Sequence, residues 1–287
     1  MNIELIGVGL IGSSMILDLR KKLDLNVIGH DLDTNNLNYA LNNGIIDQIG
    51  KQKKFHNCDI IFLATPVDVS LKLLPEILKI IDKNTLVIDF GSTKEEICKA
   101  VENHFNRDLF LATHPIAGNE FSGSKHAVNN LFKDKIQIFC EKNKTRKDLL
   151  KIAKKLFLSL GMKIKEMTPE IHDKHMAIVS HLSHISSFML GKTVLDKKSK
   201  IDILDLAGSG FESTVRLAKS SPDMWTPIFS QNKFNILKIL DEYIKNLIDF
   251  KTELLNDNFN QINNQIKYTN ELKSVLDKIT KKNKNEE

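Results

Sequence analysis

The sequence predicts an α/β protein in which a mostly parallel, doubly wound sheet over residues 1–167 is followed by an all-α domain over residues 168–287. Up to residue 167, short apolar runs alternate with longer helical patterns, and strands connected through helices pair in parallel by right-handed crossovers. After residue 168 only helical periodicity continues. A chain of 287 residues is long enough for two domains, each with its own core.

The strands are predicted from short runs of apolar and β-branched residues. They cover residues 3–7, 26–30, 59–64, 85–90, 109–113, 136–140 and 163–167. Helix-length patterns separate the early strands, at residues 10–22, 34–43, 69–81 and 94–104. This alternation places helices on both faces of the sheet.

Four helical patterns follow, at residues 169–191, 200–220, 222–254 and 258–279, and the tail 281–287 is expected to fray. Ser221 and Pro222 are typical of an N-cap and a first helical residue, whereas Pro227 predicts a delayed start or a kink. An apolar stripe then recurs at three- and four-residue spacing, at Phe229, Ile236, Leu240, Tyr243 or Ile244, and Leu247. We expect part of this stripe to pack against a second subunit, which predicts a homodimer through the helical domain.

Charge and composition exclude several kinds of partner. The net charge is +5, but the lysines are scattered among acidic residues, so we expect no nucleic-acid binding. No run approaches the ~18 apolar residues of a membrane span, and the N-terminus has no cationic leader, so we expect no signal peptide and no membrane insertion. Cys58, Cys98 and Cys140 form no CxxC pair, which predicts no disulfide framework, no thiolate metal site and a cytoplasmic location.

The string "GVGLIGSS" at residues 7–14 predicts a Rossmann-type dinucleotide site, because it matches G-x-G-x-x-G between a strand and a helix. Gly7 permits the turn, Gly9 lets a pyrophosphate approach the backbone, and Gly12 lets the helix pack closely on the sheet. The motif also contains Leu10 and Ile11, where the free N–H groups of the helix start face the anion. A glycine turn without a nucleotide is the alternative.

Asp31 lies 19 residues past Gly12, at the end of the next predicted strand. Its carboxylate is suited to accept hydrogen bonds from the adenosine ribose and to repel a 2′-phosphate, and no arginine follows it. The predicted cofactor is therefore NAD rather than NADP.

His114 and Ser92 follow two neighbouring predicted strands, at the edge where dinucleotide folds of this type bind ligands. NAD takes a hydride from a carbon that bears a hydroxyl, so another group must accept the hydroxyl proton, and imidazole is the best-matched side chain at neutral pH. Ser92 is placed to hydrogen-bond the ring and fix its tautomer. The alternative is a histidine that only satisfies a loop.

The sequence resembles the prephenate and arogenate dehydrogenases of tyrosine biosynthesis over most of its length. The matching motifs are "GVGLIGSS", "HDLD", "GIIDQ", "ATPV", "DFGSTK", "HPIAGNEFSG", "MTPEIHDKHMAIVSHLSH" and "GFESTVRLAKSSPDMW". The resemblance implies a dinucleotide domain, a helical dimerisation domain and an active site between them. It also implies NAD-dependent oxidative decarboxylation of prephenate to 4-hydroxyphenylpyruvate, and it adds Thr65 and Pro66 of "ATPV" to the cofactor site.

The resemblance also implies roles for individual residues. His114 would accept the hydrogen bond from the substrate's ring hydroxyl, Ser92 would support it near the nicotinamide, and Arg216 would bind a substrate carboxylate. A guanidinium is suited to that task because its fork pairs with both carboxylate oxygens. Glu120 lies where the family commonly has a glutamate near the cleft, and a surface carboxylate is the alternative.

Four histidines follow the last strand, but one continuous helix at 100° per residue places His181 opposite His172 and His184 opposite His175. They are therefore predicted not to bind one metal ion. His181 and His184 are expected to share a face toward the substrate, with a core position as the alternative. His172 and His175 are expected at solvent or packing positions.

Three other functions stay open. Arogenate carries an amino group in place of the keto oxygen of prephenate, and the sequence "GSGFES" at residues 208–213 lacks the basic and acidic residues that the family often has there. A β-hydroxyacid type of dehydrogenase would need a catalytic lysine, for which Lys174 is the nearby candidate. A non-catalytic NAD-sensing dimer would explain the glycine turn but not Ser92, His114 and Arg216 together. Tyrosine is a possible inhibitor at the active site.

Overall fold

The computed structural model describes residues 1–50, 55, 57–197 and 205–277 of the chain. Two compact units form, Met1–Ile236 and Leu237–Glu287, and each is described by itself. In the part of the chain that is described, no helix is both long enough and apolar enough to cross a membrane.

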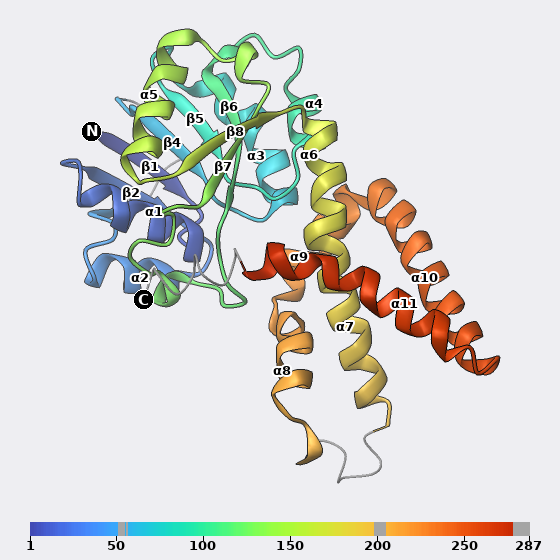
Figure 1. Ribbon diagram of the computed structural model, residues 1–287. Helices are drawn as coiled ribbons and strands as arrows, with labels where there is room; N and C mark the ends of the chain where they lie inside the picture. Colours follow the sequence, from blue (N-terminus) through green and yellow to red (C-terminus); the bar gives the residue numbers. More distant parts are fainter. Residues whose placement is uncertain (51–54, 56, 198–204, 278–287) are drawn as a thin grey trace. The chain divides into compact units, whose positions relative to one another are not determined.

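The first unit contains one eight-stranded sheet with the order β3-β2-β1-β4-β5-β6-β7-β8 (Figure 1). All neighbours pair in parallel except β6 and β7, which are antiparallel. The strands are β1 (Asn2–Ile6), β2 (Asn26–His30), β3 (Gln48–Ile49), β4 (Ile60–Leu63), β5 (Leu86–Asp89), β6 (Phe110–Ile116), β7 (Ile136–Cys140) and β8 (Lys163–Met167).

Helices connect the strands and continue after them. The α-helices of the first unit are α1 (Leu10–Arg20), α2 (Thr34–Asn42), α3 (Val67–Ile80), α4 (Glu95–Ala100), α5 (Lys147–Ser159), α6 (Pro169–Met176), α7 (Leu182–Leu195), α8 (Ser209–Val215) and α9 (Pro222–Gln231). A π-helix, Ala177–His181, separates α6 from α7, and a 3₁₀ helix, Arg216–Lys219, follows α8. Helix α10 (Lys233–Leu255) leads into the second unit, which also holds α11 (Phe259–Thr269).

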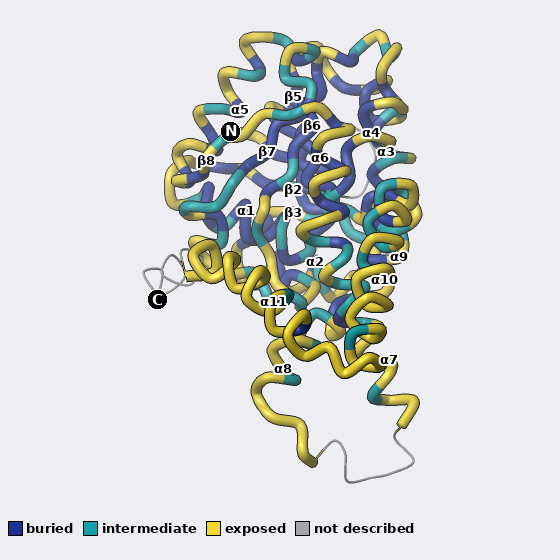
Figure 2. Tube along the Cα trace, turned by 45° about the vertical axis from the view of Figure 1, so that its right-hand side comes forward, coloured by how far each residue is buried: buried dark blue, intermediate teal, exposed yellow. Residues whose placement is uncertain are grey.

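The core lies in the central strands. All four residues of β4 and of β5 are buried, because a parallel strand covered on both faces presents no side to water. Figure 2 shows the strands as the buried part of the chain, whereas α10 and α11 are largely exposed. Phe157 of α5 packs edge-on against Phe90 and Phe139 at the strand ends. Cys58, Cys98 and Cys140 are free and buried.

The predicted fold class and all seven predicted strands are confirmed, with β3 as an additional two-residue strand. The predicted helix 169–191 is interrupted by the π-helix, and 222–254 divides into α9 and α10 at Asn232. The delayed start expected from Pro227 is wrong, because α9 begins at Pro222 and contains Pro227. Residues 198–204 of the predicted helix 200–220, and the tail 281–287, lie outside the described residues. The domain boundary between residues 167 and 168 stays a prediction.

Candidate active site

The glycine turn after β1 leaves room for a ligand only at Gly9. Gly7 has a φ of +94°, and a Cβ there would lie 2.5 Å from the carbonyl oxygen of Ala64. A Cβ at Gly12 would lie 2.5 Å from the carbonyl oxygen of Gly7, so this helix position also admits no side chain. At Gly9 a Cβ meets nothing within 4 Å. No side chain caps α1, so N–H groups in its first turn, including those of the predicted Leu10 and Ile11, stay available for an anion.

Asp31 is held beside this turn by backbone amides. Its carboxylate accepts hydrogen bonds from the N–H of Val8 at 2.7 Å and from the N–H of Asp33 at 2.8 Å. The next residue, Leu32, is 98% exposed. Thr65 follows β4 and hydrogen-bonds Ser70 at 2.8 Å, and the exposed Pro66 is the N-cap residue of α3. Because β1 and β4 are adjacent, the turns after them lie together at the carboxyl edge of the sheet.

His114 lies within β6 rather than after it, which corrects the predicted strand end. Antiparallel pairing with β7 extends β6, so His114 pairs with Ile138 two residues past Ala112, where the pairing with β5 ends. The ring is half-buried, and its Nδ1 lies 2.8 Å from Nε2 of His172. In the part of the chain that is described, no hydrogen bond joins it to Ser92, the partner predicted from the sequence.

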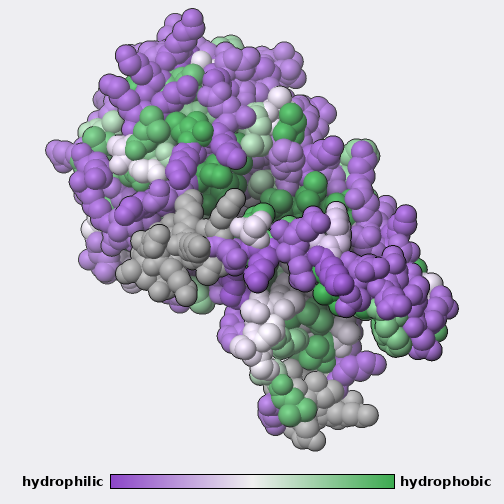
Figure 3. All heavy atoms as spheres, in the orientation of Figure 1, coloured by the Kyte–Doolittle hydropathy of each residue, from purple (hydrophilic) through white to green (hydrophobic). Residues whose placement is uncertain are grey.

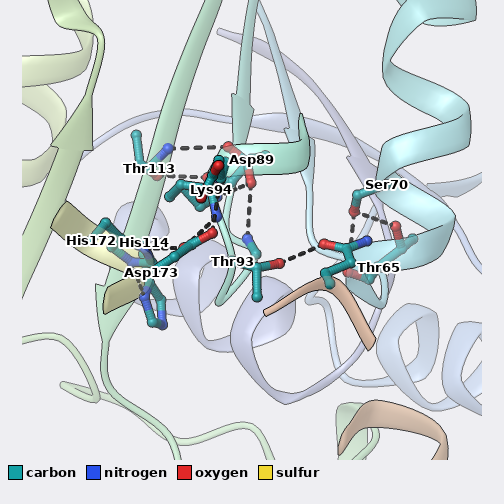
Figure 4. A network of polar contacts seen from close by, with 12 residues as sticks. Thr65, Ser70, Asp89, Thr93, Lys94, Thr113, His114, His172 and Asp173 are labelled. Atoms are coloured by element: carbon teal, nitrogen blue, oxygen red, sulfur yellow. Dashed lines mark hydrogen bonds and ion pairs between the residues drawn. The ribbon is translucent and has the colours of Figure 1, made fainter. Parts of the chain in front are cut away.

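His172 and Asp173 lie beside His114 (Figure 4). His172 is fully buried, which is the packing rather than the solvent alternative predicted for it, and its Nδ1 lies 2.7 Å from Oδ1 of Asp173. The Asp173 carboxylate also accepts the N–H groups of Lys94 at 2.8 Å and Glu95 at 2.9 Å, at the start of α4. Three donors therefore converge on one buried carboxylate.

A second buried carboxylate holds the segment between β5 and α4. Asp89 forms an ion pair with Lys94, and both side chains are fully buried. Burial raises the pKa of Asp89, which the Lys94 ammonium opposes. Asp89 also accepts the N–H of Thr113 and the N–H of Gly91, each at 3.1 Å. This ion pair fixes both ends of the segment that carries the half-buried Ser92.

The π-helix corrects the predicted separation of the histidines. An i→i+5 turn shifts the phase of the helix after it, so His181 lies near His172 instead of opposite it, and His172 contributes to the lowered pKa of His181. His172 hydrogen-bonds Asp173 directly, and His181 is connected to Asp173 through Asn232. Asn232 donates through Nδ2 to the Asp173 carbonyl oxygen at 2.7 Å and lies 3.1 Å from Nδ1 of His181. Asn232 and Asp173 were missed from the sequence, because only the tertiary fold brings them together.

His184 and Arg216 form a second group in the same unit. The His184 ring stacks on Trp225 with centroids 3.5 Å apart, and its Nδ1 donates to the Ser180 carbonyl oxygen at 3.0 Å. Arg216 pairs with Glu120 at 2.8 Å, and its side chain is 51% exposed while that of Glu120 is 11% exposed. The positive charge of Arg216 also contributes to the lowered pKa of His184, so these groups lie close to one another.

Burial keeps the clustered histidines neutral. It lowers the pKa of His172 to about 3 and of His181 to about 4. The pKa of His114 falls well below its ordinary value, mainly through burial and also through the nearby His172, Lys94 and His181. His114 is therefore an unprotonated base at neutral pH. Among the described residues, no group of three or more His, Cys, Asp or Glu side chains is arranged to hold a metal ion.

The other sequence candidates lie at the surface. Lys174 and His175 are exposed on α6, so His175 has the solvent position predicted for it. Glu212 and Ser213, which replace the family's basic and acidic residues, are exposed on α8.

Comparison with known proteins identifies the family. Residues 15–166 match "Prephenate dehydrogenase, nucleotide-binding domain", and residues 168–268 match "Prephenate dehydrogenase, dimerization domain". A prephenate dehydrogenase of Bacillus subtilis is 31% identical over 256 residues, covering 87% of this chain and 69% of the relative.

Two solved structures extend the match. Prephenate dehydrogenase from A. aeolicus, in complex with hydroxyphenyl propionate and NAD⁺, has a TM-score of 0.86 at 30% identity, covering 95% of this chain and 96% of that one. Synechocystis arogenate dehydrogenase has a TM-score of 0.73 at 27% identity, covering 94% of this chain and 98% of that one. The chain belongs to the prephenate dehydrogenase family.

Proposed function

We propose that the protein is an NAD-dependent prephenate dehydrogenase that forms 4-hydroxyphenylpyruvate and carbon dioxide in tyrosine biosynthesis. The observation that carries the proposal is His114, a half-buried and neutral imidazole held on a paired strand in the same unit as the glycine turn and Arg216. A neutral imidazole accepts a proton at neutral pH without first having to lose one.

The residues around the glycine turn fit NAD. The open space at Gly9 and the uncapped start of α1 would hold the pyrophosphate, and the Asp31 carboxylate would accept hydrogen bonds from the ribose hydroxyls. Thr65 and Pro66 would border the cofactor from the adjacent strand end. When bound, NAD supplies the acceptor for a hydride from the carbon that bears the substrate hydroxyl.

The NAD assignment has a direct test. Replacing Asp31 by Ser removes the carboxylate, so KM for NAD should rise while KM for prephenate stays unchanged. Equal rates of the unaltered protein with NAD and NADP would contradict the assignment.

His114 would control the hydroxyl proton. Its ring accepts the hydrogen bond from the hydroxyl as the hydride leaves the same carbon, and it returns the proton to the phenol oxygen as the ring carboxylate departs as carbon dioxide. The electron pair of the bond to the lost carboxylate completes the aromatic ring, and the ring oxygen ends as a protonated phenol. His181 and His184 would face the same substrate, and Ser92 would lie near the nicotinamide.

Arg216 would bind a substrate carboxylate. Its guanidinium is half exposed and already pairs with one carboxylate, that of Glu120. A substrate carboxylate would therefore share or replace this partner, and a planar fork accommodates either geometry.

We also infer a homodimer formed through the helical domain. The second family match is described as a dimerization domain, and apolar side chains of α7 and α10 are exposed in the single chain, among them Met189, Leu195, Leu247 and Ile248. Figure 3 shows apolar atoms at the surface over α7 and α8. Light scattering should give twice the chain mass of 32.6 kDa, and a monomer at micromolar concentration would contradict the inference.

Arogenate is the second candidate substrate, supported by the similarity to the Synechocystis enzyme. The higher identity to relatives named prephenate dehydrogenases favours prephenate. The test is to mix protein and NAD with each substrate and follow the absorbance of reduced nicotinamide. A larger kcat/KM for arogenate would overturn the prephenate assignment, and no reduction with either would overturn the proposed function.

A further inference from the structure

Two hydrogen bonds in series connect a buried carboxylate to the proposed base. Oδ1 of Asp173 lies 2.7 Å from Nδ1 of His172, and Nε2 of His172 lies 2.8 Å from Nδ1 of His114 (Figure 4). A neutral imidazole has one N–H and one lone pair, so the role of one nitrogen dictates the role of the other. The whole series is therefore set by the group at its buried end.

That group is an acceptor. The N–H groups of Lys94 and Glu95 donate to the two oxygens of Asp173, and the Lys94 ammonium lies nearby. Burial raises the pKa of Asp173, but each of these three interactions stabilises the ionised carboxylate, and the two N–H groups leave its oxygens as acceptors. His172 must then donate through Nδ1, which leaves its Nε2 lone pair to accept the Nδ1–H of His114.

We propose that Asp173 and His172 are positioning residues that lock His114 in the tautomer with its lone pair on Nε2, the nitrogen that accepts the substrate's hydroxyl proton. This inference rests on the proposed function. Neither residue touches the reacting atoms in this scheme. Both act by removing the tautomer in which Nε2 of His114 carries a hydrogen and cannot accept one.

The opposite tautomer is imposed on His181 through the same residue. The Asp173 carbonyl can only accept, so the Asn232 atom bound to it is the amide nitrogen. The assignment is reinforced because Oδ1 of Asn232 accepts from Asn235 at 2.8 Å. The amide therefore donates to Nδ1 of His181, which leaves that ring with an N–H at Nε2. Asp173 thus leaves Nε2 of His114 as an acceptor and Nε2 of His181 as a donor.

Two amide substitutions at position 172 separate this role from packing. The side-chain oxygen of Gln reaches about as far as Nε2 of histidine and can accept the His114 Nδ1–H, whereas Asn reaches only as far as Nδ1. We expect His172→Asn to lower kcat about 10²-fold, with KM for NAD unchanged, and His172→Gln to keep kcat within about threefold of the original. His175→Asn, on the exposed face of the same helix, is the matched control and should leave kcat unchanged.

A spectroscopic measurement tests the tautomer without turnover. Histidine ¹⁵N–¹³C correlation spectra of the full-length protein, assigned with a His114→Asn variant, should show the proton of His114 on Nδ1 and that of His181 on Nε2. In His172→Asn the His114 signals should shift toward the other tautomer, and in His172→Gln they should not.

The outcomes are distinct from those of the proposed function. A His114 proton on Nε2 in the unaltered protein, or equal kcat values for the Asn and Gln variants, would overturn the inference even if prephenate is oxidised. If prephenate and arogenate are both inert, the spectra alone decide whether the tautomer is locked. Unaltered spectra in His172→Asn would also overturn it.

Discussion

At the scale of single residues, candidate site residues could be identified from the sequence where they lie close together along the chain. Gly7, Gly9, Gly12 and Asp31 were predicted because their spacing is a property of one strand–turn–helix unit. His172 and Asp173 were not predicted as partners of His114, because residues 58 positions apart along the chain meet only when α6 packs beside β6. The apparent partner in the sequence was Ser92, which shares the edge of the sheet with His114.

The sharpest test at this scale is His114→Asn. Asparagine is polar and smaller but is not a base, so kcat should fall about 10²–10⁴-fold. Affinity for NAD, measured by titration of the protein fluorescence, should stay unchanged because His114 is not part of the glycine turn. Turnover equal to that of the unaltered protein would show that another group accepts the proton.

Arg216→Met tests the carboxylate site. It keeps a long side chain but removes the charge, so KM for prephenate should rise about 10- to 100-fold, as expected for loss of hydrogen bonds to a charged group. Lys219→Met, at the other end of the same 3₁₀ helix, is the control. An unchanged KM for prephenate in Arg216→Met would show that a different cation binds the substrate carboxylate.

At the scale of secondary-structure elements, the strands were predictable because short, continuous apolar runs are typical of parallel strands that helices cover on both faces. The π-helix was not predictable. A π-helical turn has no sequence signature of its own, and its last residue, His181, contacts Asn232, which lies 51 positions away along the chain. Because the predicted continuous helix left out this π-helix, it placed His181 opposite His172, whereas the two lie near each other.

The glycine turn gives a matched pair of element-scale variants. Gly12→Ala places a Cβ against the carbonyl of Gly7 and should destabilise the protein by about 1–3 kcal/mol. Gly9→Ala meets open space at an ordinary φ of −90°, so its unfolding midpoint in urea should match that of the original. NAD affinity should nevertheless fall in Gly9→Ala, since the Cβ fills the space for the pyrophosphate. Loss of stability in Gly9→Ala with unchanged NAD affinity would contradict this assignment.

At the scale of the whole molecule, the division into a sheet followed by helices was evident from the loss of strand-like runs after residue 167. The two family matches, to residues 15–166 and 168–268, follow the same order along the chain. Association between chains was inferred from an apolar stripe. No pattern in one sequence specifies the facing residues of a partner surface, so that level of detail was not predictable.

Stability should fall as the solution is acidified below about pH 6.5. His172 and His181 have folded-state pKa values of about 3 and about 4, so between these values and 6.5 the unfolded chain binds protons that the native chain does not. Above about pH 6.5 neither state is protonated at these groups, and they add no pH dependence. Burial raises the pKa of Asp173, so protonation of this carboxyl affects stability in the opposite sense as the pH falls.

Urea unfolding at several pH values between about 5 and 7.5 measures this slope. His172→Gln should make the slope shallower, because one buried imidazole is lost. His175→Gln should leave it unchanged, since that side chain is exposed. A stability that is flat over this range would contradict the neutral, buried state of the histidine cluster.

The antiparallel pairing of β6 with β7 holds His114 independently of the loop that follows β6. Because that ladder carries the imidazole beyond the end of β5 on hydrogen-bonded backbone, its position does not depend on the connection 117–123 that follows. Engineers seeking to oxidise other cyclic alcohols can therefore vary that connection around Glu120, the partner of Arg216, while the proposed proton acceptor keeps its place on the sheet.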